Sequence, residues 1–132
     1  MKKNVFILFI SLLSFNAFAQ WQPAGEKIKT AWAEKIDVKN VLPEYPRPIM
    51  ERADWQNMNG LWEYAITKVG APQPENFDGE ILVPFAVESS LSGVQKRVGA
   101  EKELWYKRSF TVPSTWKSKK ILLHFGAVDW KS

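Results

Sequence analysis

Residues 104–112 read LWYKRSFTV, and the alternation of their side chains decides the fold class. Successive side chains of a β-strand point to opposite faces of a sheet. A strand over these residues places on one face Leu104, Tyr106, Phe110 and Val112, and on the other Trp105, Lys107, Ser109 and Thr111. The stretch therefore predicts a β-strand with one apolar face.

Three more strands are predicted around this one. Residues 61–66 read LWEYAI and follow an Asn-Gly turn signal, residues 80–84 end at a proline, and residues 120–128 follow a turn at 113–115. In the first and last of these strands, alternation places on one face Trp62, Tyr64 and Ile66, and Ile121, Leu123 and Phe125. Strands without intervening helices or repeats predict an all-β, antiparallel fold of the sandwich type.

The number of predicted strands is small for such a fold. A jelly-roll sandwich uses about eight strands, and half of that number leaves unpaired edges and an uncovered apolar face. We therefore expect residues 55–132 to form a partial antiparallel β-sandwich, the first half of a jelly roll, within a larger protein.

The stretch before the first strand, residues 20–54, has a different pattern. Ile28, Trp32 and Ile36 recur every four residues among charged side chains, which predicts an amphipathic helical stripe of about three turns. Because both signs of charge flank the stripe, we expect it to dock on a neighbouring domain rather than on a membrane. The prolines of residues 43–48 then predict an extended strap, since proline disfavours helix.

Residues 1–19 resemble a cleaved export signal. A basic start at residues 1–3 precedes an apolar run over residues 5–15, and the small-x-small pattern of residues 17–19 predicts cleavage between Ala19 and Gln20. A helix of that run would rise roughly 16 Å, about half of the ~30 Å hydrocarbon core, so we expect no stable membrane anchor. A buried N-terminal helix is the alternative interpretation.

Composition excludes several classes of site. The chain has 132 residues with 45% hydrophobic and 24% charged residues, which is typical of a globular domain. It has no cysteine and one histidine, His124, so we expect no disulfide, thiolate zinc site or multi-histidine metal site, and no cofactor.

Without residues 1–19 the 18 basic residues fall to 16 against 14 acidic ones, a charge of +2 that predicts no nucleic-acid partner. An exported chain without cysteine favours a bacterial periplasm or exterior.

Five motifs stand in order along the chain: YPRP at 45–48, WQNMNGLW at 55–62, ILVPF at 81–85, LWYKRSFTVP at 104–113 and LHFGAVD at 123–129. Together they resemble the N-terminal sugar-binding domain of glycoside hydrolase family 2, the family of β-galactosidases and β-glucuronidases. The resemblance covers roughly residues 45–129, and it rests on the order and spacing of the five motifs rather than on any one of them.

The resemblance implies a galactose-binding-like jelly roll, followed by an immunoglobulin-like domain and a (β/α)8 barrel with two catalytic glutamates. The barrel is not among these 132 residues, so no catalytic residue is carried over. We expect a non-catalytic part of an exported glycoside hydrolase, inactive alone, with a glycoside and the C-terminal domains of the same enzyme as its partners. A galactoside, a glucuronide and a mannoside remain equally open as substrates. The alternatives are a freestanding carbohydrate-binding module and a structural fragment with no sugar role.

The candidate substrate contacts are Glu88, Ser89 and Ser90. They follow the predicted strand 80–84, and the resemblance implies that this loop region lies toward the active site of the intact enzyme. The alternative is an ordinary polar loop. Glycoside hydrolysis needs two carboxylates about 5–10 Å apart, and no pair of acids in the sequence stands out for that task.

Other polar and aromatic residues carry weaker indications. Trp105 would stack on a sugar ring or pack between sheets or domains. We expect His124 to be a structural residue of its strand, and we expect a solvated basic loop at Lys117, Lys119 and Lys120.

Overall fold

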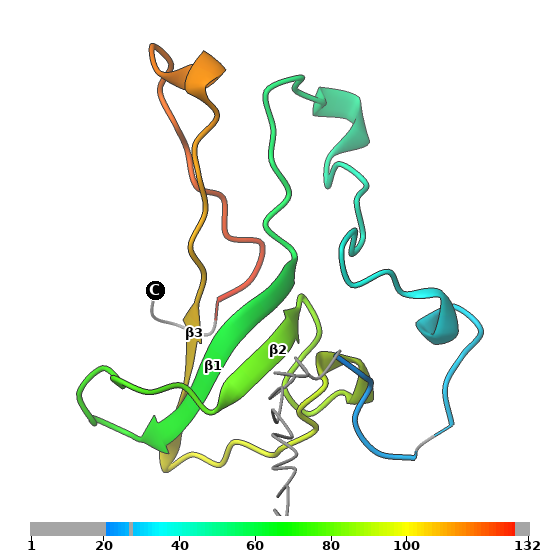
Figure 1. Ribbon diagram of the computed structural model, residues 1–132, viewed down its shortest axis with the longest axis vertical. Helices are drawn as coiled ribbons and strands as arrows, with labels where there is room; N and C mark the ends of the chain where they lie inside the picture. Colours follow the sequence, from blue (N-terminus) through cyan, green and yellow to red (C-terminus); the bar gives the residue numbers. More distant parts are fainter. Residues whose placement is uncertain (1–20, 27, 129–132) are drawn as a thin grey trace, which may run out of the picture.

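The computed structural model describes residues 21–26 and 28–128, and its centre is one antiparallel sheet (Figure 1). The strands are β1 (Gly60–Lys68), β2 (Gly79–Val83) and β3 (Lys102–Lys107), in the order β2-β1-β3. The other elements are single 3-10 turns: η1 (Ala33–Lys35), η2 (Pro48–Met50), η3 (Ser90–Ser92) and η4 (Ser114–Trp116). The all-β, antiparallel prediction is therefore confirmed for the described part of the chain.

The central strand β1 pairs with both neighbours, and its register fixes the two faces of the sheet. Trp62 lies opposite Ile81 of β2, and Tyr64 lies opposite Tyr106 of β3. Since side chains alternate along a strand, Trp62, Tyr64 and Ile66 share one face, as the sequence predicted. We call this the core face.

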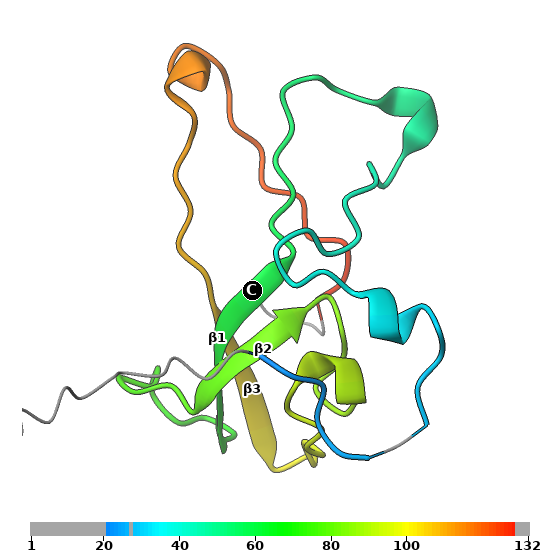
Figure 2. The same ribbon diagram turned by 45° about the vertical axis from the view of Figure 1, so that its right-hand side comes forward.

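The hydrophobic core lies between the core face and the segment that joins β2 to β3, residues 84–101. Tyr64, Ile81 and Val87 are its buried members. Half-buried side chains pack around them, from the sheet Trp62, Ile66, Val83 and Leu104, and from the joining segment Val94 and Val98. Figure 2 shows that segment, with η3, beside the sheet. The removal of these apolar surfaces from water holds the joining segment against β1 and β2.

Strand β3 is shorter than predicted, because it ends at Lys107 and not at Val112. The ladder with β1 stops at the pair Glu63 and Lys107. Just beyond it the guanidinium of Arg108 donates to the carbonyl oxygen of Leu61. A side chain thus binds a backbone acceptor at the point where the ladder stops, and residues 108–112 continue without a strand partner.

The predicted strand over residues 120–128 is wrong, since the structure has no strand there. Its apolar side chains do not divide into a buried and an exposed set: those exposed by 40–62% are Ile121, Leu122, Leu123, Phe125 and Val128. A strand requires a neighbour for its backbone donors and acceptors. No neighbouring strand of the described chain reaches this segment, so the alternation in the sequence finds nothing to pair with.

The helical stripe predicted at Ile28, Trp32 and Ile36 is also wrong in the described residues. Only the turn η1 is helical, and Ile28 and Trp32 lie almost fully in solvent. An isolated helix of three turns is marginal in water without a packing partner.

In the strap, Pro48 begins the turn η2, so the proline-rich stretch is not extended throughout. The predicted leader, residues 1–19, and the cleavage site at Ala19 and Gln20 lie outside the described residues. No helix within the described ranges has the length and apolar character needed to cross a membrane.

Two long loops rise from one end of the sheet, residues 46–59 and 108–128 (Figure 1). Contacts to one carboxylate join them. The indole Nε1–H of Trp116 donates to Oδ1 of Asp54 at 3.0 Å, and the ammonium of Lys119 pairs with Oδ2. The hydrogen bond from Lys119 is the largest cause that lowers the pKa of Asp54 below its ordinary value.

Acidification is therefore expected to separate the two loops. Because the pKa of Asp54 is lowered in the folded protein, its contribution is complete above the ordinary value of 3.8 and is lost as the pH falls through the lower folded value. The indole N–H resonance of Trp116 in an NMR titration below about pH 5 measures this change. We expect Asp54→Asn to abolish the titration and Asp37→Asn, on another loop, to preserve it. A Trp116 resonance that still titrates in Asp54→Asn would contradict the assignment.

Candidate functional site

The sequence candidates Ser89 and Ser90 lie at the start of η3, in the segment that covers the core face. The hydroxyl of Ser89 accepts a hydrogen bond from the backbone N–H of Leu91 at 3.1 Å and so caps the turn. The hydroxyl of Ser90 donates to the carbonyl oxygen of Ala24, and the N–H of Ala24 donates back to the Ser90 carbonyl oxygen at 2.8 Å. Both hydroxyls therefore bind the protein's own backbone, and Ser90 ties the N-terminal segment to the loop.

The residue that organises this loop is Ser92, which the sequence analysis missed. It is fully buried, and its hydroxyl lies 2.7 Å from the carbonyl oxygen of Ser89 and accepts from the N–H of Val94 at 3.0 Å. A buried hydroxyl is tolerated only when its hydrogen bonds are made, as they are here. The signal available in the sequence is the following Gly93, which takes a φ of 80° and ends the turn. A Ser-Gly pair of this kind marks a tight turn with a capping hydroxyl.

Of the three candidate substrate contacts, Glu88 is the one with an exposed side chain, and its charge acts on the hydroxyl of Tyr106. The rings of Trp62 and Tyr106 meet edge to face with centroids 6.4 Å apart. Partial burial raises the pKa of the Tyr106 hydroxyl, and the negative charge of Glu88 raises that pKa further. The phenol therefore stays protonated and a hydrogen-bond donor at neutral pH.

We group three side chains as the candidate site, because the Trp62 and Tyr106 rings meet and the charge of Glu88 acts on the Tyr106 hydroxyl, and we call this group the Glu88 surface. Tyr106 is 42% exposed, and the indole N–H of Trp62 donates to the carbonyl oxygen of Met58 at 2.8 Å, which fixes the ring. A carboxylate accepts hydrogen bonds, a phenol donates them, and aromatic rings offer apolar area. This combination suits a polyhydroxylated ligand with one apolar face.

Several of the described acids are engaged in other contacts, and Glu63 of β1 lies directly opposite Glu80 of β2 in the ladder. Glu63 forms an ion pair with Lys107 at 2.8 Å, and Asp78 and Glu103 accept backbone N–H groups from Ile66 and Gly70. Among the described residues no group of three or more histidine, aspartate or glutamate side chains could hold a metal ion. The Glu88 surface can bind a ligand, but on this geometry it contains no second carboxylate for catalysis.

The remaining sequence candidates are not among the residues of the Glu88 surface. Trp105 points to the face of the sheet opposite the core face and donates its indole N–H to the hydroxyl of Thr67 at 2.9 Å. His124 is exposed on a loop and not in a strand, so its predicted place in a strand is wrong. Lys117 and Lys120 are exposed, whereas Lys119 binds Asp54.

Comparison with known proteins adds no relative: no family model matches the chain, and no curated protein matches its sequence.

Proposed function

We propose that the chain is the N-terminal, non-catalytic, sugar-binding portion of an exported bacterial glycoside hydrolase of family 2. In this proposal residues 1–19 direct export, cleavage leaves Gln20 as the first residue, and the sheet is the first half of a jelly-roll sandwich. The sandwich is completed by further residues of the same parent enzyme, whose barrel carries out hydrolysis.

The observation that carries this proposal is the position of the family-like motifs in the fold. Three of the five motif segments overlap the three strands: 55–62 enters β1, 81–85 contains the end of β2, and 104–113 contains most of β3. Motifs that are dispersed over the sequence thus meet side by side in one antiparallel sheet. This is the arrangement expected if they hold together half of a sandwich.

The open sides of the sheet support the same proposal. β2 and β3 are both edge strands, and eight of the large hydrophobic residues from Tyr106 onward are exposed by 40% or more. Unpaired edges and exposed apolar side chains are unfavourable in an isolated domain. Additional strands from the parent enzyme would pair with those edges and cover that surface.

The Glu88 surface supplies the sugar-directed part of the proposal. Its carboxylate would accept hydrogen bonds from sugar hydroxyl groups, and the Tyr106 hydroxyl would donate one. The chain would therefore position a glycoside, whereas bond cleavage would belong to the carboxylates of the barrel.

The test uses the exported chain, purified and identified by an intact mass that begins at Gln20. We expect no turnover of aryl galactosides, glucuronides or mannosides, and we expect the coding DNA of the parent to encode a barrel with two catalytic glutamates. A turnover that disappears in Glu88→Gln but persists in Glu75→Gln, an exposed acid on the β1–β2 loop, would overturn the proposal and make Glu88 catalytic. Sugar binding by a stable monomer without any parent barrel would instead favour a freestanding carbohydrate-binding module.

A further inference from the structure

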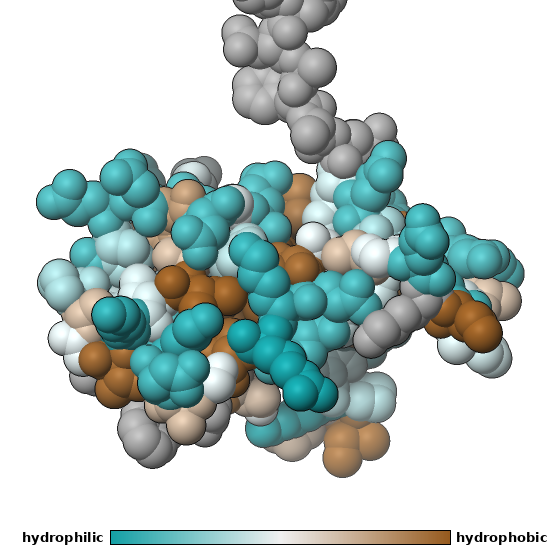
Figure 3. Space-filling view, turned by 90° about the horizontal axis from the view of Figure 1, so that it is seen from below, coloured by the Kyte–Doolittle hydropathy of each residue, from teal (hydrophilic) through white to brown (hydrophobic). Residues whose placement is uncertain are grey.

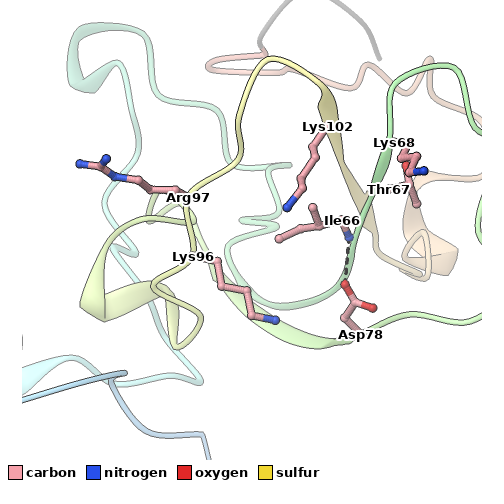
Figure 4. A pocket seen from close by; sticks show the side chains of 7 residues that line it. All are labelled: Ile66, Thr67, Lys68, Asp78, Lys96, Arg97 and Lys102. Carbon is pink, nitrogen blue, oxygen red and sulfur yellow. Dashed lines mark hydrogen bonds between the residues drawn. The ribbon is translucent and has the colours of Figure 1, made fainter.

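A basic concavity of about 470 Å³ lies beside the core face, where the end of β1 meets the start of β3. Ile66 lies within it, and the charged residues around it are Lys68, Asp78, Lys96, Arg97 and Lys102 (Figure 4). The lining thus carries four cationic side chains and a single carboxylate. Seen from below, this end of the molecule shows apolar surface surrounded by hydrophilic side chains (Figure 3).

Two of the cations occupy an unfavourable position for the stability of the sheet. Lys68 of β1 lies directly opposite Lys102 of β3 in the ladder. Like charges directly opposite one another in a sheet are destabilising. Over the described residues the ion pairs are those of Lys107 with Glu63 and Lys119 with Asp54, so neither Lys68 nor Lys102 is neutralised by an ion pair. A local cost without a structural compensation is typical of a functional site.

The single carboxylate of the concavity is already engaged. Oδ2 of Asp78 accepts a hydrogen bond from the backbone N–H of Ile66 at 2.9 Å. This hydrogen bond ties the loop between β1 and β2 to β1. When the charge of Asp78 is counted against the four cations, the concavity has an excess of three positive charges.

The directions of the side chains select the groups that can meet a ligand. Lys102 extends toward Ile66 and Lys96 passes below Ile66 on the side of Asp78, whereas Arg97 and Lys68 are directed away from Ile66 (Figure 4). The ammonium of Lys96 lies 3.3 Å from the Tyr64 hydroxyl and 5.6 Å from the centre of that ring, so the aromatic side chain holds it in place. Two ammonium groups therefore face a shared opening next to an apolar side chain.

We propose that this concavity binds the carboxylate or sulfate group of an acidic carbohydrate. An oxyanion has several oxygen acceptors, so it can bridge the ammonium groups of Lys96 and Lys102 and relieve the repulsion between Lys102 and Lys68. Ile66 offers an apolar surface for the carbon face of the sugar ring. The oxyanion part rests on this geometry alone, and the carbohydrate part rests on the proposed function.

The experiment measures binding of a hexameric oligogalacturonide to the full chain at low ionic strength by calorimetry. We expect Lys102→Gln and Lys96→Gln each to weaken binding about tenfold, since charged hydrogen bonds are among the strong ones. Lys117→Gln, which removes the same charge just after the distant turn η4, should leave binding unchanged. A neutral cello-oligosaccharide of equal length should not bind. As a readout of the folded state, Lys102→Gln should raise the thermal midpoint in the absence of anion, because it removes the like-charge pair.

The outcomes distinguish this inference from the proposed function. Equal losses in Lys102→Gln and Lys117→Gln, or a lower thermal midpoint in Lys102→Gln, would overturn the oxyanion site. Inorganic sulfate could raise the thermal midpoint of the chain, but not that of Lys102→Gln, while the oligogalacturonide does not bind. That result would overturn the carbohydrate part of the inference, and the site would then give no support to the proposed function. Tighter binding of a single-stranded oligonucleotide than of the oligogalacturonide would also overturn it, in favour of a nucleic-acid site. A uronide that binds through Lys102 while the parent gene encodes no barrel would support the site and contradict the proposed function.

Discussion

Replacing Ile81 with alanine is expected to destabilise the sheet by about 2–5 kcal/mol, the range observed when a large aliphatic side chain is removed from a core. Ile81 is completely buried and packs with Tyr64 and Val87 on the core face. Six hydrophobic residues of the described chain are buried, so the core has few contacts to replace those that are lost. Because folded domains are stable by only about 5–15 kcal/mol, this single change should consume a large part of the stability.

Amide hydrogen exchange of β1 and β2 in dilute solution measures this effect without requiring a single global transition. The matched control is Ile49→Ala, because Ile49 is 92% exposed on the turn η2. We expect the control to change stability by less than about 0.5 kcal/mol, as is usual for exposed positions. Equal exchange rates in the two variants would show that Ile81 does not lie in a core.

The strands that the sequence predicted correctly are those whose apolar faces find a partner. The face shared by Trp62, Tyr64 and Ile66 exists because residues 84–101 cover it, and β2 forms where predicted because Ile81 and Leu82 are both buried. Periodicity reports which side chains would share a face. A periodic segment forms a strand only where a neighbouring strand pairs with its backbone and other residues cover its apolar face.

The segment 120–128 shows why the rest could not be predicted. Its alternation is as regular as that of residues 61–66, yet it stands exposed and unpaired. Alternation carries no information on whether a partner strand lies beside it in the folded chain. The same argument applies to the stripe at Ile28 and Trp32, whose helical spacing lacks a packing partner.

The candidate site was predicted in part. Glu88 was singled out and is exposed, but Ser89 and Ser90 are engaged with backbone groups, and the contribution of Tyr106 depends on strand register. Residue type identifies a possible ligand group, whereas its availability is decided by the hydrogen bonds that the fold has already assigned to it. The basic concavity escaped prediction for a related reason, because Lys68 and Lys102 are 34 positions apart and meet only through the ladder.

The exposed apolar segment leads to the second large expectation, that the chain associates in solution. Leu123 and Phe125 are 59% and 62% exposed beside other uncovered apolar residues. Contiguous apolar surface and unpaired strand edges drive association. Burial of one large aliphatic or aromatic side chain is worth about 1.5–3 kcal/mol, and each tenfold change in an equilibrium constant corresponds to about 1.4 kcal/mol. We expect the double variant Leu123→Ser with Phe125→Ser to raise the concentration at which oligomers form by about tenfold or more.

Sedimentation velocity and light scattering over a range of concentrations measure this shift. The control is Trp32→Ser with Ile49→Ser, which removes two side chains that are even more exposed but lie outside the segment. If total apolar exposure drove association, the control would act at least as strongly as the test variant. If the segment itself is a contact surface, only the test variant acts, because four exposed apolar side chains follow one another between residues 122 and 128. Under the proposed function, the strands that complete the sandwich would cover the same side chains, so restoring them should suppress association as effectively as the two serines do.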